Sequence, residues 1–372
     1  MYSTYYKYGN PKIKKRSIPE KIGEGTYGCI YKPSLECVNN EYNILDYDNL
    51  VGKYGDLESN KEELKSTELI EKIDPKNEFH LPTPILCKPK TSGIDFHTCD
   101  VKVNNGSLLV MHNGGYDLSN FCKNYLMTWL KTNKISIFLK EFSKLFYGLI
   151  VFKKKGIIHY DLKPQNILFN PEKNRIVYID FGLMTKKNSI INDGKMGYEG
   201  SFHWSYPLDN YYLNKKHYDE FMGESMENKK MYADVFLKKI NGQEIKDKMI
   251  DDKLKIHHPR AFVSFFKDIN YGNNLLKIEK TDIDIFFNTL INYRGTYDEF
   301  ADKTVDTIDI YGLGMTLQFV INILFDKGII KKELFNELTI LSYSMYNFNF
   351  EERMDNPELL YKMYNKIIKK YV

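Results

Sequence analysis

The stretch IIHYDLKPQNILF, which occupies residues 157–169, places His159, Asp161 and Asn166 in the spacing H-x-D-L-x-x-x-N. A short turn, PEKN, follows it, and the next stretch, RIVYIDFG, contains the triplet D-F-G that begins at Asp180. Two aspartates and an asparagine so close in sequence offer one candidate proton acceptor and two oxygen ligands of the kind that Mg²⁺ prefers. Each residue alone carries little information, and the inference rests on their joint order.

Nearer the N-terminus, the stretch IGEGTYGCIY sets Gly23, Gly25 and Gly28 in the spacing G-x-G-x-x-G. A dinucleotide-binding loop with this spacing opens a helix, and the pyrophosphate lies at the N-terminus of that helix. Here Ile30 and Pro33 follow the glycines, which favours a strand. The pattern predicts a hairpin whose backbone covers nucleotide phosphates, and the alternative is a tight hairpin without a ligand.

Length and composition limit the class of protein. The chain has 372 residues, of which 42% are hydrophobic and 15% aromatic, and its net charge is +4. This composition is typical of a folded protein with one large or two smaller domains, and the mild charge gives no indication of nucleic acid binding. We expect no membrane span, because no apolar run approaches about 20 residues, and no signal peptide.

The five cysteines are odd in number and have no C-x-x-C spacing. They are Cys29, Cys37, Cys87, Cys99 and Cys122. This pattern predicts neither a disulfide framework nor a zinc site, and it favours reduced thiols in a cytosol-like compartment.

The order of the predicted strands and helices along the chain indicates an α+β protein with two lobes. Residues 1–17 form a basic tail that we expect to be flexible. Residues 18–111 read as a small lobe of short strands with one helix, NKEELKSTELIEKI. Residues 112–116 connect it to a larger, mainly helical lobe at residues 117–372, in which ISIFLKEFSKLFYGLIVFKKKG predicts a long amphipathic helix that ends at Gly156.

Taken in this order, the glycine loop, the H-x-D-L-x-x-x-N stretch and the D-F-G triplet resemble the eukaryotic-type serine/threonine protein kinase superfamily over nearly the whole chain. The resemblance implies a bilobal kinase fold and transfer of the γ-phosphate of ATP, with Mg²⁺, to serine or threonine hydroxyls of protein substrates. The helix sequence ELKS is similar to the casein-kinase-1-like and vaccinia-related branch, and YKP and IDP resemble kinases of large DNA viruses. This branch implies a viral protein in the host cytoplasm or the virion, with no nucleic acid or membrane partner, and leaves the oligomeric state open.

The resemblance assigns the chemical roles. Asp161 is expected to accept the proton of the substrate hydroxyl, and Lys163 to contact the transferred phosphate. Asn166 and Asp180 are the expected Mg²⁺ ligands. Lysine at position 163 resembles serine/threonine kinases more than tyrosine kinases.

The resemblance also assigns a nucleotide site. Lys53, which ends the stretch LVGK, matches the lysine that holds the α- and β-phosphates, although a surface lysine is the alternative. Glu63 is its expected partner, and Glu62 and Glu68 are the other candidates. The remaining nucleotide contacts that the resemblance implies are Ile22, Gly23, Gly25 and Gly28 in the loop, Ile30, Val51 and Leu168 around the adenine, Met111 as gatekeeper and Asp117 at the ribose.

The stretch GSFHWSYPL resembles G-T-x-x-Y-x-A-P-E but departs from it. Ser201 stands at the threonine position, whereas Tyr206 replaces the alanine and Leu208 replaces a glutamate that normally pairs with a buried arginine. We expect Arg353 to be that arginine and Asp209 to replace the glutamate, because an unpaired buried guanidinium is costly.

Two further features follow from the resemblance. Asp309, in DIYGLG, is expected to brace the backbone of the catalytic loop. The insert at about residues 210–305 is longer than usual, and MYADVFLKKI and FFNTLINYR in it predict helices packed on the large lobe. Such an insert is either structural or a surface for a substrate or partner.

Tyr160 stands where kinases activated by phosphorylation carry an arginine that binds the activation-loop phosphate. Its phenol has no charge to offer, so we expect a protein that is active as synthesised, with the activation segment held by packing around Trp204 and Tyr206. Two other function classes stay open. One is a pseudokinase that binds nucleotide without turnover, and the other is a small-molecule or lipid kinase on a related fold.

Overall fold

The computed structural model describes residues 18–25, 28–38, 42, 44, 46–90, 99, 105–198, 204–240 and 280–372. The predicted basic tail and the middle of the insert, residues 241–279, therefore lie outside the described residues.

The chain divides into two compact units, which we call the small unit and the large unit. The small unit comprises Met1–Thr67 and Pro82–Asn113, and the large unit comprises Glu68–Leu81 and Gly114–Val372. The sequence places residues 68–81 in the small lobe, whereas their contacts belong to the large unit. For example, the backbone N–H of Tyr178 donates a hydrogen bond to the carbonyl of Phe79 over 2.8 Å.

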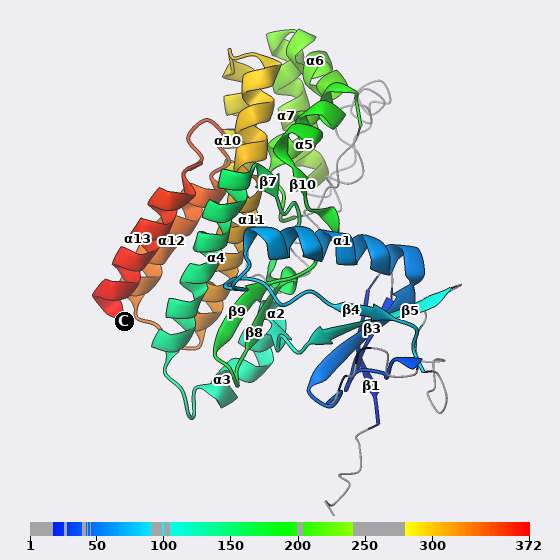
Figure 1. Ribbon diagram of the computed structural model, residues 1–372. Coiled ribbons are helices and arrows are strands. Elements are labelled where there is room, and N and C mark those ends of the chain that lie inside the picture. Colours follow the sequence, from blue (N-terminus) through cyan, green and yellow to red (C-terminus); the bar gives the residue numbers. More distant parts are fainter. Residues whose placement is uncertain are drawn as a thin grey trace, which may run out of the picture. The chain divides into compact units, whose positions relative to one another are not determined.

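The small unit contains a five-stranded antiparallel sheet with the strand order β1-β2-β3-β5-β4 (Figure 1). The strands are β1 (Glu20–Gly25), β2 (Gly28–Lys32), β3 (Leu50–Asp56), β4 (Ile85–Cys87) and β5 (Gly106–His112). Helix α1 (Leu57–Ile73) follows β3 directly and contains the predicted helix. Four side chains of β2 and β5 share one face, as the two-residue period of a strand requires, and are at most 3% exposed: Cys29, Tyr31, Leu108 and Val110. Leu109, on the other face of β5, is also buried.

Two disulfides cross-link the small unit, so the expectation of reduced thiols is wrong for four of the five cysteines. Cys29 is bonded to Cys99, and Cys37 is bonded to Cys87. Cys122 is the free, buried thiol, and burial raises its pKa to about 12. The partners are 70 and 50 residues apart in sequence, so the folding of the sheet brings them together and no local spacing reveals them.

The large unit is mainly helical. Its helices are α2 (Leu118–Asn120), α3 (Leu126–Trp129), α4 (Ile135–Lys155), α5 (Lys187–Lys195), α6 (Lys215–Gly223), α7 (Met226–Ile240), α10 (Lys280–Asn292), α11 (Tyr297–Asp326), α12 (Lys332–Tyr346) and α13 (Pro357–Tyr371). Shorter 3-10 or π turns are η3 (Phe121–Tyr125), η4 (Pro164–Asn166), η5 (Phe181–Leu183) and η6 (Leu208–Leu213). Its described residues also form two small antiparallel sheets. One consists of β6 (Tyr116–Asp117), β8 (Ile167–Asn170) and β9 (Arg175–Tyr178), and the other of β7 (Ile157–Ile158) and β10 (Thr185–Lys186).

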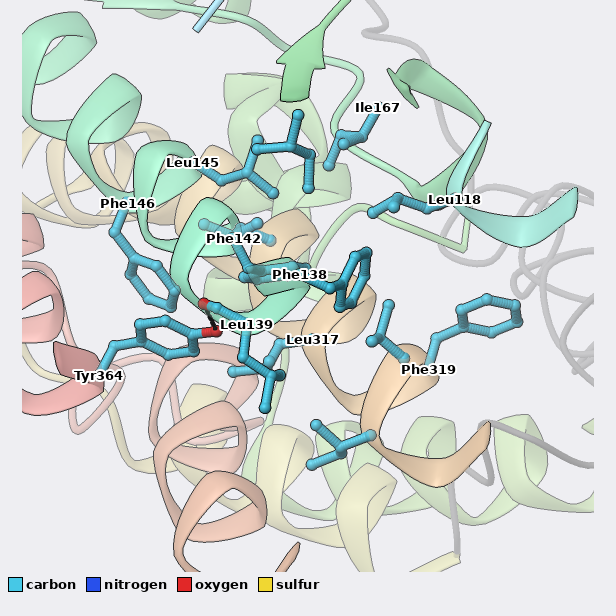
Figure 2. Close-up of a cluster of buried hydrophobic side chains, with 14 of the residues drawn as sticks. Leu118, Phe138, Leu139, Phe142, Leu145, Phe146, Ile167, Leu317, Phe319 and Tyr364 are labelled. Atoms are coloured by element: carbon cyan, nitrogen blue, oxygen red, sulfur yellow. Dashed lines mark hydrogen bonds between the residues drawn. The ribbon is translucent and has the colours of Figure 1, made fainter. Parts of the chain in front are cut away.

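Helix α4 confirms the predicted amphipathic helix and ends, as expected, before Gly156. Its side chains Phe138, Phe142 and Phe146 are fully buried and pack against residues of α11 and α13 (Figure 2). The hydroxyl of Tyr364, on α13, donates a 2.7 Å hydrogen bond to the carbonyl of Leu139 in this core. The apolar period of α4 therefore fixes the helix that directly precedes β7 and the stretch with Asp161 and Asn166.

Helices α7 and α10 confirm the helices predicted in the insert, and they contact each other. Phe286, Phe287 and Leu290 of α10 are buried in a second apolar cluster that also contains Tyr212 and Phe221. Helix α11 is long and apolar enough to cross a membrane, but 89% of its most apolar window is buried within the protein. Antiparallel sheets and helices that alternate in no regular βαβ order make the chain an α+β protein.

Candidate functional site

In the small unit, the strand register gathers four of the expected nucleotide contacts on one face of the sheet. Ile30 of β2 lies opposite Lys53 of β3, and Val51 of β3 lies opposite Met111 of β5. Cross-strand partners share a face, so these four side chains lie together on the face opposite the buried Cys29. All four are partly exposed, as a ligand-binding face requires.

Lys53 and Glu63 form an ion pair between β3 and α1. Their side chains are 18% and 22% exposed. The two other candidates, Glu62 and Glu68, are also on α1, but their side chains are exposed to solvent. The spacing of acids on α1 therefore points one carboxylate, that of Glu63, at the lysine of the sheet.

The glycine hairpin has a structural reason for one of its glycines. A Cβ on Gly28 would lie 2.4 Å from the carbonyl oxygen of Tyr54, so β2 and β3 need a glycine here whether or not a phosphate binds. Gly23 has room for a Cβ, and Ile22 is 57% exposed. Gly25 ends β1, and the hairpin tip after it lies outside the described residues.

In the large unit, three of the predicted site residues are in direct contact. The Nζ of Lys163 donates to both carboxylate oxygens of Asp161, over 2.8 and 2.9 Å. The Nδ2 of Asn166 donates to Asp161 Oδ2 over 2.7 Å. Burial raises the pKa of Asp161 above its usual value, and the hydrogen bond from Lys163 opposes that rise. A largely buried carboxylate with a cation and an amide beside it can accept a proton from an alcohol.

The loop that carries Asp161 is braced from α11, as expected. The carboxylate of Asp309 accepts the backbone N–H of His159 over 2.7 Å and that of Tyr160 over 2.9 Å. Burial raises the pKa of Asp309 to about 7, and the two N–H donors oppose the rise. One turn further along α11, a Cβ on Gly312 would lie 2.5 Å from the carbonyl oxygen of Leu162, so glycine lets the loop approach the helix closely.

Asp180 is exposed and adopts a left-handed backbone with φ 61°. The residue before it, Ile179, is fixed on both sides. Its N–H donates to the carbonyl of Asn166 over 3.0 Å, and its carbonyl accepts the Nε2–H of His159 over 3.1 Å. Burial lowers the pKa of His159 to about 4, so the imidazole is neutral. Asp180 is thus tied through the backbone to the loop of Asp161 and Asn166.

A metal ion would have two candidate ligands in the large unit. The two side-chain hydrogen bonds that the structure describes for Asn166 both use its Nδ2, which makes Oδ1 the atom suited to a cation, and Asp180 presents an exposed carboxylate. Mg²⁺ keeps several waters and phosphate oxygens as ligands, so two protein ligands fit it. Within the described ranges, no group of three or more His, Cys, Asp and Glu residues could hold a metal ion.

Leu168 and Asp117 are cross-strand neighbours on β8 and β6 of the large unit. Asp117 also caps helix α2, because its side chain accepts the backbone N–H of Asn120 over 2.9 Å. The aspartate therefore has a structural role that does not depend on a ribose.

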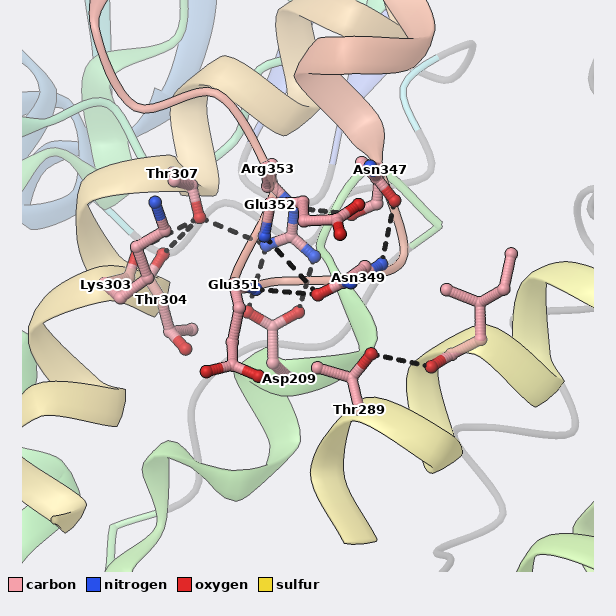
Figure 3. Close-up of polar contacts among 11 residues, drawn as sticks. Asp209, Thr289, Lys303, Thr304, Thr307, Asn347, Asn349, Glu351, Glu352 and Arg353 are labelled. Atoms are coloured by element: carbon pink, nitrogen blue, oxygen red, sulfur yellow. Dashed lines mark hydrogen bonds and ion pairs between the residues drawn. The ribbon is translucent and has the colours of Figure 1, made fainter. Parts of the chain in front are cut away.

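The expected replacement of the missing glutamate is confirmed (Figure 3). Arg353 donates to both carboxylate oxygens of Asp209, over 2.8 and 3.0 Å, and the two side chains are 1% and 0% exposed. The guanidinium also donates to the carbonyl of Asn347 and to the hydroxyl of Thr307. Every donor nitrogen of this buried cation is satisfied, which such a group requires.

Sequence reasoning missed two features of this region. The segment after Asp180 forms helix α5, whose Lys187 pairs with Asp302 and Asp306 of α11 over 2.7 and 2.6 Å. The hydroxyl of Tyr206 donates a hydrogen bond to the carbonyl of Tyr160, the residue before Asp161. The only sign of this bond in the sequence is a tyrosine where the resembling motif has alanine. The expected contact of Ser201 lies outside the described residues.

The two units offer complementary chemistry. The small unit provides a lysine with a carboxylate partner on an open sheet face, which suits a phosphate. The large unit provides a partly desolvated carboxylate, an ammonium, an amide oxygen and an exposed carboxylate, which suit proton transfer and a hard cation. No protein-family model matches the chain.

Proposed function

We propose that the protein is a bilobal, Mg-ATP-dependent serine/threonine protein kinase, with the small unit as N-lobe and the large unit as C-lobe. The observation that carries the proposal is the contact of Asp161 with both Lys163 and Asn166 on a loop braced by Asp309. The Lys53–Glu63 pair on the sheet supports it independently.

In the proposed reaction the protein mainly positions groups and stabilises charge, because phosphoryl transfer needs little covalent help. Asp161 would orient the substrate hydroxyl and accept its proton, while Lys163 would stabilise charge on the transferred group. Asn166 and Asp180 would hold Mg²⁺, which supplies charge neutralisation at the phosphates when bound. Lys53, held by Glu63, would bind the α- and β-phosphates.

The protonation state of Asp161 sets the expected pH dependence. A carboxylate accepts a proton only when it is ionised, and burial raises the pKa of Asp161. We therefore expect the turnover rate to fall as the pH is lowered through that raised pKa, at a higher pH than an exposed aspartate would give.

The substitution with the largest expected effect on kcat is Asp161→Asn. Its phosphoryl transfer is measured with labelled ATP, Mg²⁺ and casein as a generic acceptor. Because a positioned base contributes about 10²- to 10⁴-fold, we expect kcat to fall by that factor while ATP affinity stays within a few-fold of wild type. Asp219→Asn is the matched control, since Asp219 is an exposed aspartate on α6 and should leave kcat unchanged.

Equal kcat values for wild type and Asp161→Asn would remove Asp161 from its assigned role. A wild-type protein that binds ATP, measured by thermal stabilisation, but transfers no phosphate to casein or other acceptors would instead identify a pseudokinase. Transfer to a small alcohol or lipid headgroup but to no protein would favour the related-fold alternative.

A further inference from the structure

Tyr206 is a buried tyrosine in the segment before η6. Its side chain is 2% exposed, and its ring packs against that of Tyr160 with centroids 5.2 Å apart and an interplanar angle of 56°. The Tyr206 hydroxyl donates a hydrogen bond to the carbonyl oxygen of Tyr160. Burial raises the pKa of Tyr206, so the phenol stays protonated and keeps its hydrogen for this bond.

The residue that accepts this bond has an unusual backbone. Tyr160 has φ 65°, in the left-handed region that residues other than glycine rarely adopt. Its N–H is held by Asp309 over 2.9 Å, and its carbonyl is held by Tyr206. Both backbone polar groups of the residue are therefore fixed, one from α11 and one from the segment before η6, and its hydroxyl donates to Asn210 Oδ1 over 3.4 Å.

The carbonyl of Tyr160 belongs to the peptide plane that leads into Asp161. Because that plane is rigid, holding its oxygen also fixes the direction in which the backbone of Asp161 begins. The support itself is firm, since Leu208 and Asp209, just after Tyr206, are 1% and 0% exposed and Asp209 is bonded to Arg353.

We propose that Tyr206 is a positioning residue for Asp161, with its hydroxyl holding the Tyr160–Asp161 peptide so that the carboxylate is aimed at the substrate hydroxyl. The inference rests on the proposed function of Asp161 as proton acceptor. In kinases that are activated by phosphorylation, an arginine at the Tyr160 position binds a phosphate. Here the uncharged contact between Tyr206 and Tyr160 would hold the same part of the loop without a phosphate.

The expected effect is intermediate in size. The side chain of Asp161 keeps its own bonds to Lys163 and Asn166 when the tyrosine hydroxyl is lost. Small misplacements of a reacting group still slow transfer, so we expect Tyr206→Phe to lower kcat about tenfold, with KM for ATP within about twofold of wild type. A merely structural role would lower stability without this separation of kcat from KM.

Tyr212→Phe is the matched control. Tyr212 is 0% exposed, belongs to the same apolar cluster as Tyr206, and its hydroxyl has no hydrogen-bond partner within the part of the chain that the structure describes. Removing that hydroxyl also leaves a phenylalanine in a buried site, but it breaks no hydrogen bond among the described residues. We expect its kcat to stay within about twofold of wild type.

The decisive step repeats Tyr206→Phe in the Asp161→Asn background. If the hydroxyl acts through Asp161, the residual rate should change less than about twofold there, since residues that act as a unit are not additive. An equal tenfold loss in both backgrounds, or a Tyr206→Phe kcat within twofold of wild type, would overturn the inference.

Hydrogen exchange tests the same bond without any activity. The amides of His159 and Tyr160 should exchange faster in Tyr206→Phe than in wild type or Tyr212→Phe, because the loop loses one of the hydrogen bonds that anchor it. Unchanged exchange would refute the positioning role. If wild type transfers no phosphate while exchange rises as expected, the proposed function fails and the anchoring of the loop stands.

Discussion

The two units hold their ion pairs in different ways. In the large unit, Arg353 and Asp209 are 1% and 0% exposed, and the guanidinium has two further polar acceptors. In the small unit, Lys53 of β3 and Glu63 of α1 retain 18% and 22% exposure. The first pair is enclosed by a large core and serves the fold, whereas the second is partly open to solvent, as the proposed contact of Lys53 with a phosphate needs.

The two units also differ in what stabilises them: the large unit has an extensive apolar core, and the small unit has a small core with two disulfides. The large unit buries an extensive aromatic and aliphatic cluster around α4, α11 and α13. The small unit has a much smaller buried cluster, which includes Cys29, Cys37 and Cys87, and two disulfides cross-link it. Small folded units bury a smaller fraction of their surface, so covalent links make up for a limited core.

The largest expected effect on stability comes from breaking the enclosed pair. Asp209→Ala leaves Arg353 buried without its carboxylate, which should lower the free energy of unfolding by about 3–5 kcal/mol. Urea denaturation of the wild type and of Asp209→Ala measures this loss of unfolding free energy. Arg353→Met in the same chain should recover part of the loss, since the uncompensated charge is then gone.

Two results bear on that prediction. Asp219→Ala, which removes an exposed ion pair with Lys215, should change the unfolding free energy by no more than about 0.5 kcal/mol. Strictly additive losses in Asp209→Ala and Arg353→Met would contradict direct contact between the two side chains.

The next effect in size is that of the disulfides. Replacing Cys37 and Cys87 by alanine should destabilise the small unit by about 2–4 kcal/mol, because the open chain of the denatured state gains freedom. The denatured, non-reduced protein should titrate with one reactive thiol, that of Cys122, and not five. Five thiols, or a urea midpoint unaffected by reductant, would contradict the cross-links.

The smallest expected change in stability comes from the open pair. Lys53→Met should alter the unfolding free energy by no more than about 1 kcal/mol, since partly solvated pairs contribute little. It should nevertheless weaken ATP binding about tenfold or more, because a charged contact to phosphate is lost. Glu63→Gln should act in the same direction, whereas Glu62→Gln should not.

The Lys53–Glu63 pair would be structural if its loss lowered stability as much as the loss of the Arg353–Asp209 pair. A loss of about 3 kcal/mol or more in Lys53→Met, with unchanged nucleotide affinity measured by a fluorescent ATP analogue, would make the pair structural. The proposed nucleotide site on the sheet face would then lose its main support.

Several parts of the site could be predicted because their signals are local or have fixed spacing. Asp161, Lys163 and Asn166 lie within six residues, and one 3-10 turn, η4, brings them together. The apolar period of α4 gave its buried face before any tertiary contact was known. The Arg353–Asp209 pair spans 144 residues, but a missing glutamate beside an aspartate was enough to predict it.

By itself, the sequence predicted the helices that α1, α4, α7 and α10 form, the acid and amide residues around Asp161, and Glu63 ahead of Glu62 and Glu68 as the partner of Lys53. Only the tertiary structure decided which cysteines pair, that residues 68–81 belong to the large unit, and that the hydroxyl of Tyr206 reaches the carbonyl of Tyr160, 46 residues away. The reason is that a disulfide or a hydrogen bond to a backbone carbonyl depends on where the chain passes in space. No spacing or periodicity records that path, because backbone carbonyls are the same in every residue and a cysteine carries no mark of its partner.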